Sequence, residues 1–205
     1  MKIIAMIPAR MGSKRIPKKN IRLLNDKPLI KYAIDNAIDS NEFESIWLNS
    51  EDKRLKDIAL KSDIMFHQRP SELATDTATN REFTAEFLEK HECDYVVMIN
   101  TTSPLLKVKT IKHFCSLVRK NNFDTILSTV SEKAEVFFQK KPLNFNIFEK
   151  VNSQKIQPVD IVVWALTAWK RNVFLNFQRE KQCPVFSGRL GFYSKIKKNI
   201  SLPSS

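Results

Sequence analysis

The chain has 205 residues, 42% of them hydrophobic and 27% charged, proportions that are ordinary for a globular protein. Its formal net charge is +12, but the first 31 residues alone hold nine Lys or Arg against one Asp. A charge surplus this local favours a compact polyanion over an extended nucleic-acid track, and no apolar run approaches the roughly 20 residues that span a bilayer.

We therefore expect neither a nucleic-acid nor a membrane partner. The apolar run at 3–7 is too short for a signal-peptide core, and Arg and Lys follow it instead of small residues. These features predict a cytoplasmic protein.

Strand-like and helix-like stretches alternate along the chain. Residues 3–8 are apolar throughout, as in a strand buried on both faces, and residues 28–39 are apolar at helical spacing. The pattern further predicts strands at 45–48, 64–66, 95–99, 125–130 and 161–169. Between them it predicts helices at 52–61, 80–92 and 107–119.

This alternation predicts an α/β fold with three layers, in which helices cover both faces of a mostly parallel sheet. We expect a single domain over residues 1–205. Residues 134–155 break the rhythm, because they contain aromatic and basic residues without helical spacing. They are predicted to form an arm, a β-rich excursion or a dimerisation segment within that domain.

A cationic loop follows the first predicted strand. It holds five cations within ten residues, namely Arg10, Lys14, Arg15, Lys18 and Lys19. Ligands of parallel sheets bind beyond the carboxyl ends of the strands, which is where this loop begins. The chain has neither a Walker P-loop nor a Gly-x-Gly-x-x-Gly motif. We expect Gly12 to let the main chain turn, Ser13 to supply a hydroxyl, and Arg10 and Lys19 to bind phosphate oxygens.

The cysteines and histidines are scattered. They are Cys93, Cys115 and Cys183, with His67, His91 and His113. No Cys-x-x-Cys pair occurs, so neither a zinc site nor a disulfide framework is expected, and the cysteines are predicted to be buried packing residues.

Three motifs occur in order along the first 110 residues. They read I-P-A-R-M-G-S-K-R-I-P-K-K-N at 7–20, R-P-S-E-L-A-T-D-T-A at 69–78 and T-T-S-P-L at 101–105. Together they resemble the CMP-acylneuraminate synthetase family of cytidylyltransferases. The resemblance implies a Rossmann-like nucleotidyltransferase fold, usually dimeric, that joins CTP to the hydroxyl of an acidic sugar with Mg²⁺ and releases pyrophosphate. It thereby implies a role in cell-surface glycan biosynthesis.

The resemblance also implies a set of site residues. Arg10 and Lys19 would be catalytic. The nucleotide would be bound by Ala9, Arg10, Gly12, Ser13, Lys19, Asn20, Arg69, Ala78, Thr79 and Asn80. The acceptor would be bound by Asn100, Thr102 and Ser103. The chemistry agrees, because in-line attack on the α-phosphorus needs positioning and charge stabilisation, with no serine, histidine or cysteine nucleophile.

The departures from the family pattern concern the acceptor and the metal. Trp164-Ala165-Leu166 stands where the family carries Asn-Gly-Ala, and Ser201 and Pro203 stand where two aspartates bind Mg²⁺. The metal ligands are therefore unassigned, and ordinary N-acetylneuraminate is not the expected acceptor. Two alternatives stay open: a non-sugar phosphorylated acceptor, and a nucleotide-binding homologue with reduced activity. Some predicted site residues also have a structural alternative, such as an Arg69–Asp76 pair that only holds a loop.

Overall fold

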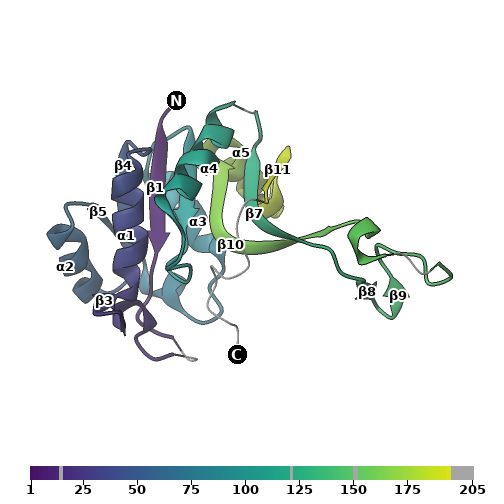
Figure 1. Ribbon diagram of the computed structural model, residues 1–205. Coiled ribbons are helices and arrows are strands. Elements are labelled where there is room, and N and C mark those ends of the chain that lie inside the picture. The colour runs from purple at the N-terminus through teal and green to yellow at the C-terminus, as the bar shows by residue number, and fades with distance from the viewer. Residues whose placement is uncertain (14–15, 121, 150–151, 195–205) are drawn as a thin grey trace.

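The computed structural model describes residues 1–13, 16–120, 122–149 and 152–194. At its centre lies a seven-stranded sheet with the strand order β11-β7-β10-β6-β1-β4-β5 (Figure 1). The strands are β1 (Ile3–Pro8), β4 (Ser45–Ser50), β5 (Met65–Gln68), β6 (Tyr95–Ile99), β7 (Thr125–Glu132), β10 (Val159–Lys170) and β11 (Leu190–Tyr193).

The sheet is mostly parallel, as the strand–helix alternation predicts. β1 pairs in parallel with β4 and β6, β4 with β5, and β7 with β11. β10 is the exception, because it runs antiparallel between β6 and β7. The central strands are buried on both faces, which explains why β1 and β6 read as continuous apolar runs.

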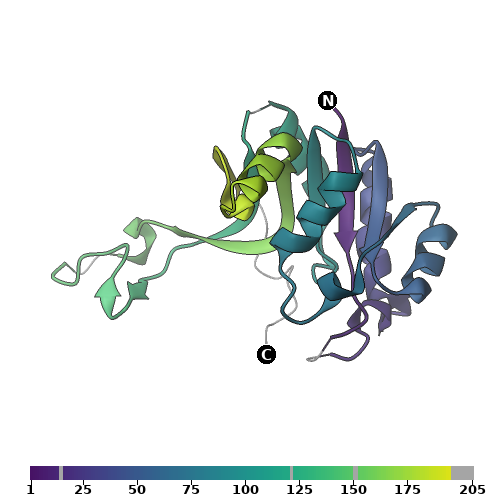
Figure 2. The ribbon, with the colours of Figure 1, turned by 180° about the vertical axis from the view of Figure 1, so that it is seen from behind.

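Helices cover both faces of this sheet (Figures 1 and 2). One face packs against α1 (Leu29–Ser40), α2 (Lys53–Lys61) and α4 (Val108–Lys120), and the other against α3 (Asn80–Lys90) and α5 (Arg171–Arg179). Two helix starts are fixed by side chains. The Asp52 carboxylate accepts from the Arg54 backbone N–H at 2.8 Å, and Thr79 forms a reciprocal capping box with Glu82.

An arm projects from the body between β7 and β10 (Figure 1). It contains a small hairpin of β8 (Phe137–Phe138) and β9 (Lys141–Pro142), and the short 3-10 helix η3 (Ser153–Lys155). The arm predicted at 134–155 is therefore present, although β8 and β9 are the only strands among its described residues, 134–149 and 152–155.

The remaining elements are short. They are η1 (Lys19–Ile21), η2 (Ser71–Ala74) and η4 (Pro184–Phe186), with a ribbon of β2 (Leu23–Leu24) and β3 (Lys27–Pro28). The predicted α/β class, three layers and all nine strands and helices through 125–130 are confirmed within a few residues. The final predicted strand is present but antiparallel, and the prediction lacks α5 and β11, which follow it.

The structure also bears on the predictions about the cysteines and about membrane-spanning segments. The three cysteines are free, but only Cys115 is fully buried; Cys93 is half-buried and Cys183 is exposed, which corrects the prediction that all are core residues. Among the helices in the described ranges, none combines the length and apolarity needed to cross a bilayer.

Candidate functional site

The carboxyl ends of four parallel strands bring the predicted site residues to one edge of the sheet. β1, β4, β5 and β6 end there, with Pro8 beside Asn49 and Ser50 beside Gln68. The cationic loop continues from β1, Arg69 follows β5, and Asn100 follows β6. The sequence therefore places its basic and polar residues where parallel sheets bind ligands.

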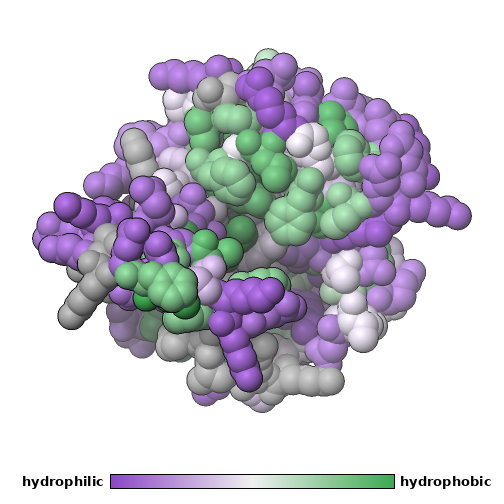
Figure 3. Space-filling view, turned by 90° about the vertical axis from the view of Figure 1, so that its right-hand side faces the viewer, coloured by the Kyte–Doolittle hydropathy of each residue, from purple (hydrophilic) through white to green (hydrophobic). Residues whose placement is uncertain are grey.

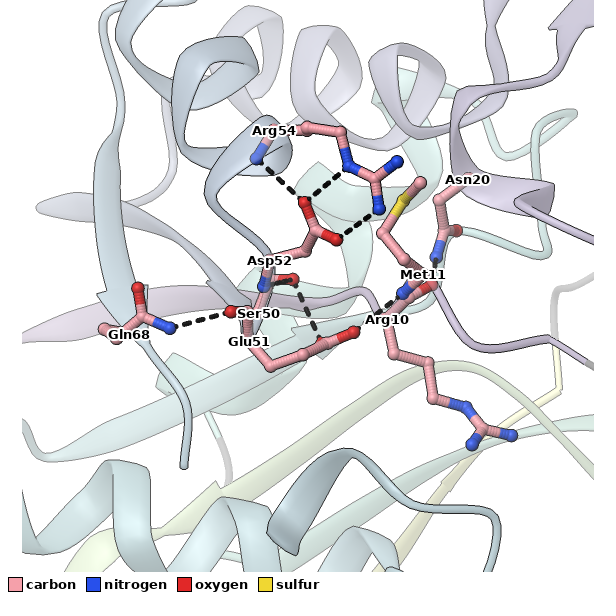
Figure 4. A network of polar contacts seen from close by, with 8 residues as sticks. All are labelled: Arg10, Met11, Asn20, Ser50, Glu51, Asp52, Arg54 and Gln68. Carbon is pink, nitrogen blue, oxygen red and sulfur yellow. Dashed lines mark hydrogen bonds and ion pairs between the residues drawn. The ribbon is translucent and has the colours of Figure 1, made fainter. Parts of the chain in front are cut away.

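The opening loop is tied to two neighbouring segments (Figure 4). The Met11 backbone N–H donates to Oε1 of Glu51 at 2.9 Å, which joins the loop to the end of β4. The buried Asn20 side chain donates to the Arg10 carbonyl at 2.9 Å and accepts from the Thr101 hydroxyl at 2.7 Å. These contacts fix the beginning and end of the loop before any ligand binds.

Arg10 points away from Asn20 (Figure 4) and pairs with a carboxylate of the second motif. Its Nη2 lies 2.8 Å from Oδ1 of Asp76, and its Nη1 donates to the Ala74 carbonyl at 3.3 Å. Both ion-pair side chains are about one third exposed, so the pair is screened and contributes little stability. The predicted alternative of an Arg69–Asp76 pair is wrong, because Asp76 pairs with Arg10.

Arg69 is a buried cation that bonds to no carboxylate of the residues described by the structure. Its Nε donates to Oδ1 of Asn49 at 2.6 Å, its Nη2 donates to the Asn49 carbonyl at 2.8 Å, and its guanidinium lies 4.4 Å from the centre of the Phe83 ring. Burial lowers its pKa to about 10, so it remains charged at neutral pH. Arg69 thus holds a fixed positive charge beside the end of β4.

Other predicted residues of the first motif lie along the same loop. Ala9 is buried and donates its N–H to the Asn49 carbonyl at 3.0 Å. Ser13 and Lys19 are half-buried, whereas Lys18 is exposed. A Cβ at Gly12 would meet no protein atom within 4 Å, and its φ lies outside the left-handed region, so the protein itself sets no steric need for glycine there and the role predicted for Gly12 stays a prediction. Lys14 and Arg15 lie outside the described residues.

The second motif leads into the N-terminus of α3. The Ala78 N–H donates to the Thr75 hydroxyl at 3.2 Å, and the Thr79 hydroxyl donates to Oε2 of Glu82 at 2.8 Å. Hydrogen bonds from the Thr79 backbone and side chain lower the pKa of Glu82. Asn80 is the first residue of the helix. The helix start is therefore firmly set at the edge that carries Arg10.

The predicted acceptor residues form a tight turn after β6. Oδ1 of Asn100 accepts from the Thr102 backbone N–H at 3.1 Å and from the Thr102 hydroxyl at 2.9 Å. Ser103 is buried and donates its N–H to the Asn100 carbonyl at 3.3 Å. The turn reaches the opening loop through the Thr101–Asn20 hydrogen bond, so the predicted acceptor residues and the predicted nucleotide residues belong to one connected structure.

Sequence reasoning missed three residues that organise this edge. Asn49 anchors Ala9 and Arg69, Glu51 anchors Met11, and Thr101 anchors Asn20. A signal exists for all of them, because each lies within three residues of the carboxyl end of a predicted strand, 45–48 for Asn49 and Glu51 and 95–99 for Thr101. Their polarity beside apolar strands marks them by the same rule that marked Arg10.

The described residues do not by themselves form a Mg²⁺ site. No group of three or more His, Cys, Asp or Glu side chains in that part of the chain is arranged to hold a metal ion. Glu51 already accepts from Met11, and Asp76 pairs with Arg10. Ser201 and Pro203, at the positions where the family resemblance places metal ligands, lie outside the described residues.

Comparison with known families gives one match over most of the chain. A family model described as "Cytidylyltransferase" matches residues 4–202. N-acylneuraminate cytidylyltransferase A of Danio rerio is 36% identical over 129 residues, which are 62% of this chain and 30% of that protein. CMP-N,N'-diacetyllegionaminic acid synthase of Legionella pneumophila is 39% identical over 119 residues, which are 55% of this chain and 51% of that protein. Matched segments cover only 30–32% of the length of several such relatives.

Solved structures agree on the fold. A CMP:2-keto-3-deoxy-manno-octonic acid synthetase complexed with CTP aligns with a TM-score of 0.71 at 16% identity, covering 95% of this chain and 90% of that one. The bifunctional IspDF from Campylobacter jejuni aligns with a TM-score of 0.71 at 15% identity, covering 98% of this chain and 52% of that one. At these identities the similarity establishes a shared nucleotidyltransferase-type fold.

Proposed function

The chain belongs to the cytidylyltransferase family, and from this premise we propose that it transfers CMP from CTP to the hydroxyl of an anionic small molecule, with release of pyrophosphate. The proposed acceptor is an acidic nonulosonate-type sugar used for cell-surface glycans. The observation that carries the proposal is the cationic opening loop, which is tied by Glu51, Asn20 and Thr101 to the carboxyl edge of the sheet.

Each part of the site has a proposed role. Arg10 and Lys19 bind the β- and γ-phosphates and stabilise the pyrophosphate as it leaves, and Ser13 adds a hydroxyl donor. The Arg10–Asp76 ion pair is partly exposed, so a phosphate can bind Arg10 either beside Asp76 or in its place. Buried Arg69 supplies a fixed charge behind the nucleotide.

The base and the acceptor are assigned to opposite sides of this phosphate region. Main chain around Ala9 and Ala78 would form a slot for the small pyrimidine ring, with Gly12, Asn20, Thr79 and Asn80 nearby. The turn formed by Asn100, Thr102 and Ser103 would face the acceptor. Catalysis then consists of aligning the acceptor oxygen with the α-phosphorus while cations stabilise the leaving group.

Mg²⁺ remains part of the proposal as the ion that accompanies the triphosphate, where it would supply charge neutralisation. We also propose that the protein acts in the cytoplasm, because the proposed donor, CTP, is drawn from the cytoplasmic pool of nucleoside triphosphates. Neither proposal assigns a residue of the chain to the ion.

A homodimer is proposed from the apolar surface of the arm. Its exposed apolar side chains are Phe137, Phe138, Leu143, Ile147 and Phe148, the last being 90% exposed. Seen along the arm, apolar side chains also gather on the body face beside it (Figure 3), and Phe192 of the edge strand β11 is half exposed. Such a surface favours a protein partner. Light scattering of the intact chain should give twice the monomer mass; a monomer at micromolar concentration would contradict this.

Pyrophosphate release tests the reaction. The chain is incubated with CTP, Mg²⁺ and one acidic sugar at a time, including N-acetylneuraminate, N,N'-diacetyllegionaminate, pseudaminate and 2-keto-3-deoxy-manno-octonate, with a phosphorylated alcohol in parallel. We expect release that requires both CTP and an acidic sugar. Pyrophosphate release only with the phosphorylated alcohol would show that the acceptor is a phosphorylated molecule and not an acidic sugar. Binding of CTP without pyrophosphate release from any acceptor would favour a nucleotide-binding homologue.

A further inference from the structure

Asn49 is a fully buried residue near the carboxyl end of β4 that bonds to residues of the first two motifs. Its exposed fraction is 0%. Its backbone carbonyl accepts from the Ala9 N–H at 3.0 Å and from Nη2 of Arg69 at 2.8 Å. Its side-chain Oδ1 accepts from Nε of Arg69 at 2.6 Å. One residue, which lies in neither motif, therefore joins the start of the opening loop to the start of the second motif.

The Asn49 amide has one orientation that satisfies both of its neighbours. Nδ2 donates to Sδ of Met6 on the adjacent strand β1 at 3.3 Å, which leaves Oδ1 to accept from Arg69. A thioether sulfur only accepts hydrogen bonds and a guanidinium only donates them, so the reversed amide would present the wrong atom to each. Met6 is also 0% exposed, so water does not compete for these contacts. The Asn49 side chain is therefore a fixed and uncharged acceptor for Arg69.

Asn49 holds Arg69 in place without neutralising its charge. Arg69 is 3% exposed, and its hydrogen bonds to described residues all go to Asn49. A buried cation is normally paired with a carboxylate, because taking a lone charge out of water is costly. The third guanidinium nitrogen, Nη1, bonds to none of the described residues, and it is not among their buried polar atoms that lack a partner. Nη1 therefore reaches solvent, and its donors remain for a ligand or water.

The carboxylates near Arg69 are bonded to other groups. Burial lowers the pKa of Arg69 most, whereas the charges of Glu51 and Glu86 raise it, which identifies these two as the acids that act on the guanidinium. Oε1 of Glu51 accepts from the Met11 N–H at 2.9 Å, and Oε2 of Glu86 lies 2.7 Å from Nε2 of His67. Both acids therefore act on Arg69 through space, and neither one caps its hydrogen-bond donors.

A buried charge that no bonded carboxylate neutralises attracts an anion strongly, because the effective dielectric around it is lower than at an exposed site and salt screens it less. We propose that Asn49 is a positioning residue for nucleotide binding, because its uncharged amide fixes Arg69 while leaving the charge of the arginine available to the anionic nucleotide. This inference rests on the proposed function, since it assigns to the nucleotide site a residue that lies outside the predicted motifs.

Two substitutions of Asn49 separate its charge from its support of the fold. Asn49→Asp keeps an oxygen acceptor for Nε of Arg69 but adds a negative charge, which the arginine beside it keeps ionised. Asn49→Ala removes the acceptor and adds no charge. By calorimetric titration, CTP affinity should fall about ten- to a hundredfold in Asn49→Asp and by less than about tenfold in Asn49→Ala. A residue that only supports the fold would give the reverse order, because Asp preserves the hydrogen bond that Ala lacks.

The charge of the ligand gives a second readout. CTP and CMP share the base and the ribose but differ by two phosphates, so Asn49→Asp should weaken CTP by a larger factor than CMP. Asn122→Asp is the matched control, because it adds the same charge at an exposed position beside Lys170, at the amino end of β6, and should leave CTP affinity unchanged. Urea unfolding confirms that each variant is folded.

The outcomes separate this inference from the reaction itself. A smaller loss of CTP affinity in Asn49→Asp than in Asn49→Ala, or equal losses for CTP and CMP in Asn49→Asp, overturn the role of Asn49 while leaving cytidylyl transfer intact. Should Asn49→Asp fail to fold, a double-mutant cycle decides: Asn49→Ala should weaken CTP binding in the wild type and add little in an Arg69→Gln background, and equal losses in both overturn the inference. No binding of CTP by the wild type overturns the proposed function, and the inference with it.

Discussion

Removing the side chain of Asn20 should detach the opening loop from the turn after β6. Asn20 is 4% exposed and makes two hydrogen bonds, to the Arg10 carbonyl at 2.9 Å and from the Thr101 hydroxyl at 2.7 Å. Asn20→Ala removes both bonds, whereas Thr101→Val removes only the second. The two substitutions therefore share one interaction and form a double-mutant cycle.

The expected cost follows from the number of bonds lost. At about 0.5–1.5 kcal/mol net for each hydrogen bond, Asn20→Ala should lower the free energy of unfolding by about 1–3 kcal/mol, and Thr101→Val by about 0.5–1.5 kcal/mol. The double variant should cost less than the sum of the two, by about 0.5–1.5 kcal/mol, because the shared bond is lost only once. Asn20→Ala should also weaken CTP binding, since Arg10 lies on the released loop.

Urea unfolding measures the stabilities, and calorimetric titration measures CTP affinity. Thr102→Val is the matched control, because the Thr102 hydroxyl bonds Asn100 rather than Asn20. Combined with Asn20→Ala, Thr102→Val should show a smaller coupling energy than Thr101→Val does. Additive losses for Asn20 and Thr101, or unchanged CTP affinity in Asn20→Ala, would refute the view that this contact positions the loop.

Three other predictions test the site and its surroundings. Lys19→Ala should weaken CTP binding roughly ten- to a hundredfold, as loss of a charge-assisted phosphate contact does, while exposed Lys18→Ala should change it much less; the reverse order would show that the cradle is misplaced by one residue. Thermal-shift titration should show stabilisation by CTP above that by ATP or GTP, even without Mg²⁺, and equal stabilisation by ATP would contradict the pyrimidine slot. Burial lowers the pKa of His67, and burial followed by the charge of His67 lowers the pKa of His91 to about 4, from the ordinary 6.5. The unfolded chain therefore takes up protons that the folded chain resists, so the melting temperature should hold above pH 6.5 and fall as pH drops toward 4, and His91→Phe should flatten that fall.

The contact between His67 and His91 could not be predicted from the sequence. His67 Nδ1 lies 2.9 Å from His91 Nε2, and His67 Nε2 lies 2.7 Å from Oε2 of Glu86. His67 lies on β5, Glu86 lies on α3 and His91 directly follows α3, and no local sequence pattern joins His67 to the other two. They approach because β5 packs beside the C-terminal half of α3, which is a property of the assembled fold.

The central sheet was predictable from local pattern, and the strand order was not. Continuous apolar runs, such as those that form β1 and β6, predict strands that are buried on both faces of a sheet. The run at 161–169 carries the same signal, yet β10 enters between β6 and β7 in the opposite direction. The chain returns along the arm, so this direction depends on a long connection that periodicity does not describe.

The convergence of the candidate site residues was predictable from the sequence, and their individual contacts were less so. The cationic loop, the residues after β5 and the turn after β6 do converge on one edge, as the rule for parallel sheets requires. The partners within that edge differ from expectation. Arg10 forms an ion pair with Asp76, and Arg69 donates a hydrogen bond to the uncharged Asn49. At Gly12, a Cβ would meet no protein atom within 4 Å. Such pairings depend on side-chain packing that motif spacing leaves open.

The fate of the α-phosphate of CTP tests the account most directly. The chain is incubated with Mg²⁺, N,N'-diacetyllegionaminate and CTP labelled at the α-phosphate, and the products are separated and identified by mass. The account predicts that the label moves into a compound of CMP joined to the sugar, in an amount equal to the pyrophosphate released, and that Lys19→Ala reduces both together. Label that stays in CTP, or that appears only as free CMP, would contradict cytidylyl transfer by this chain.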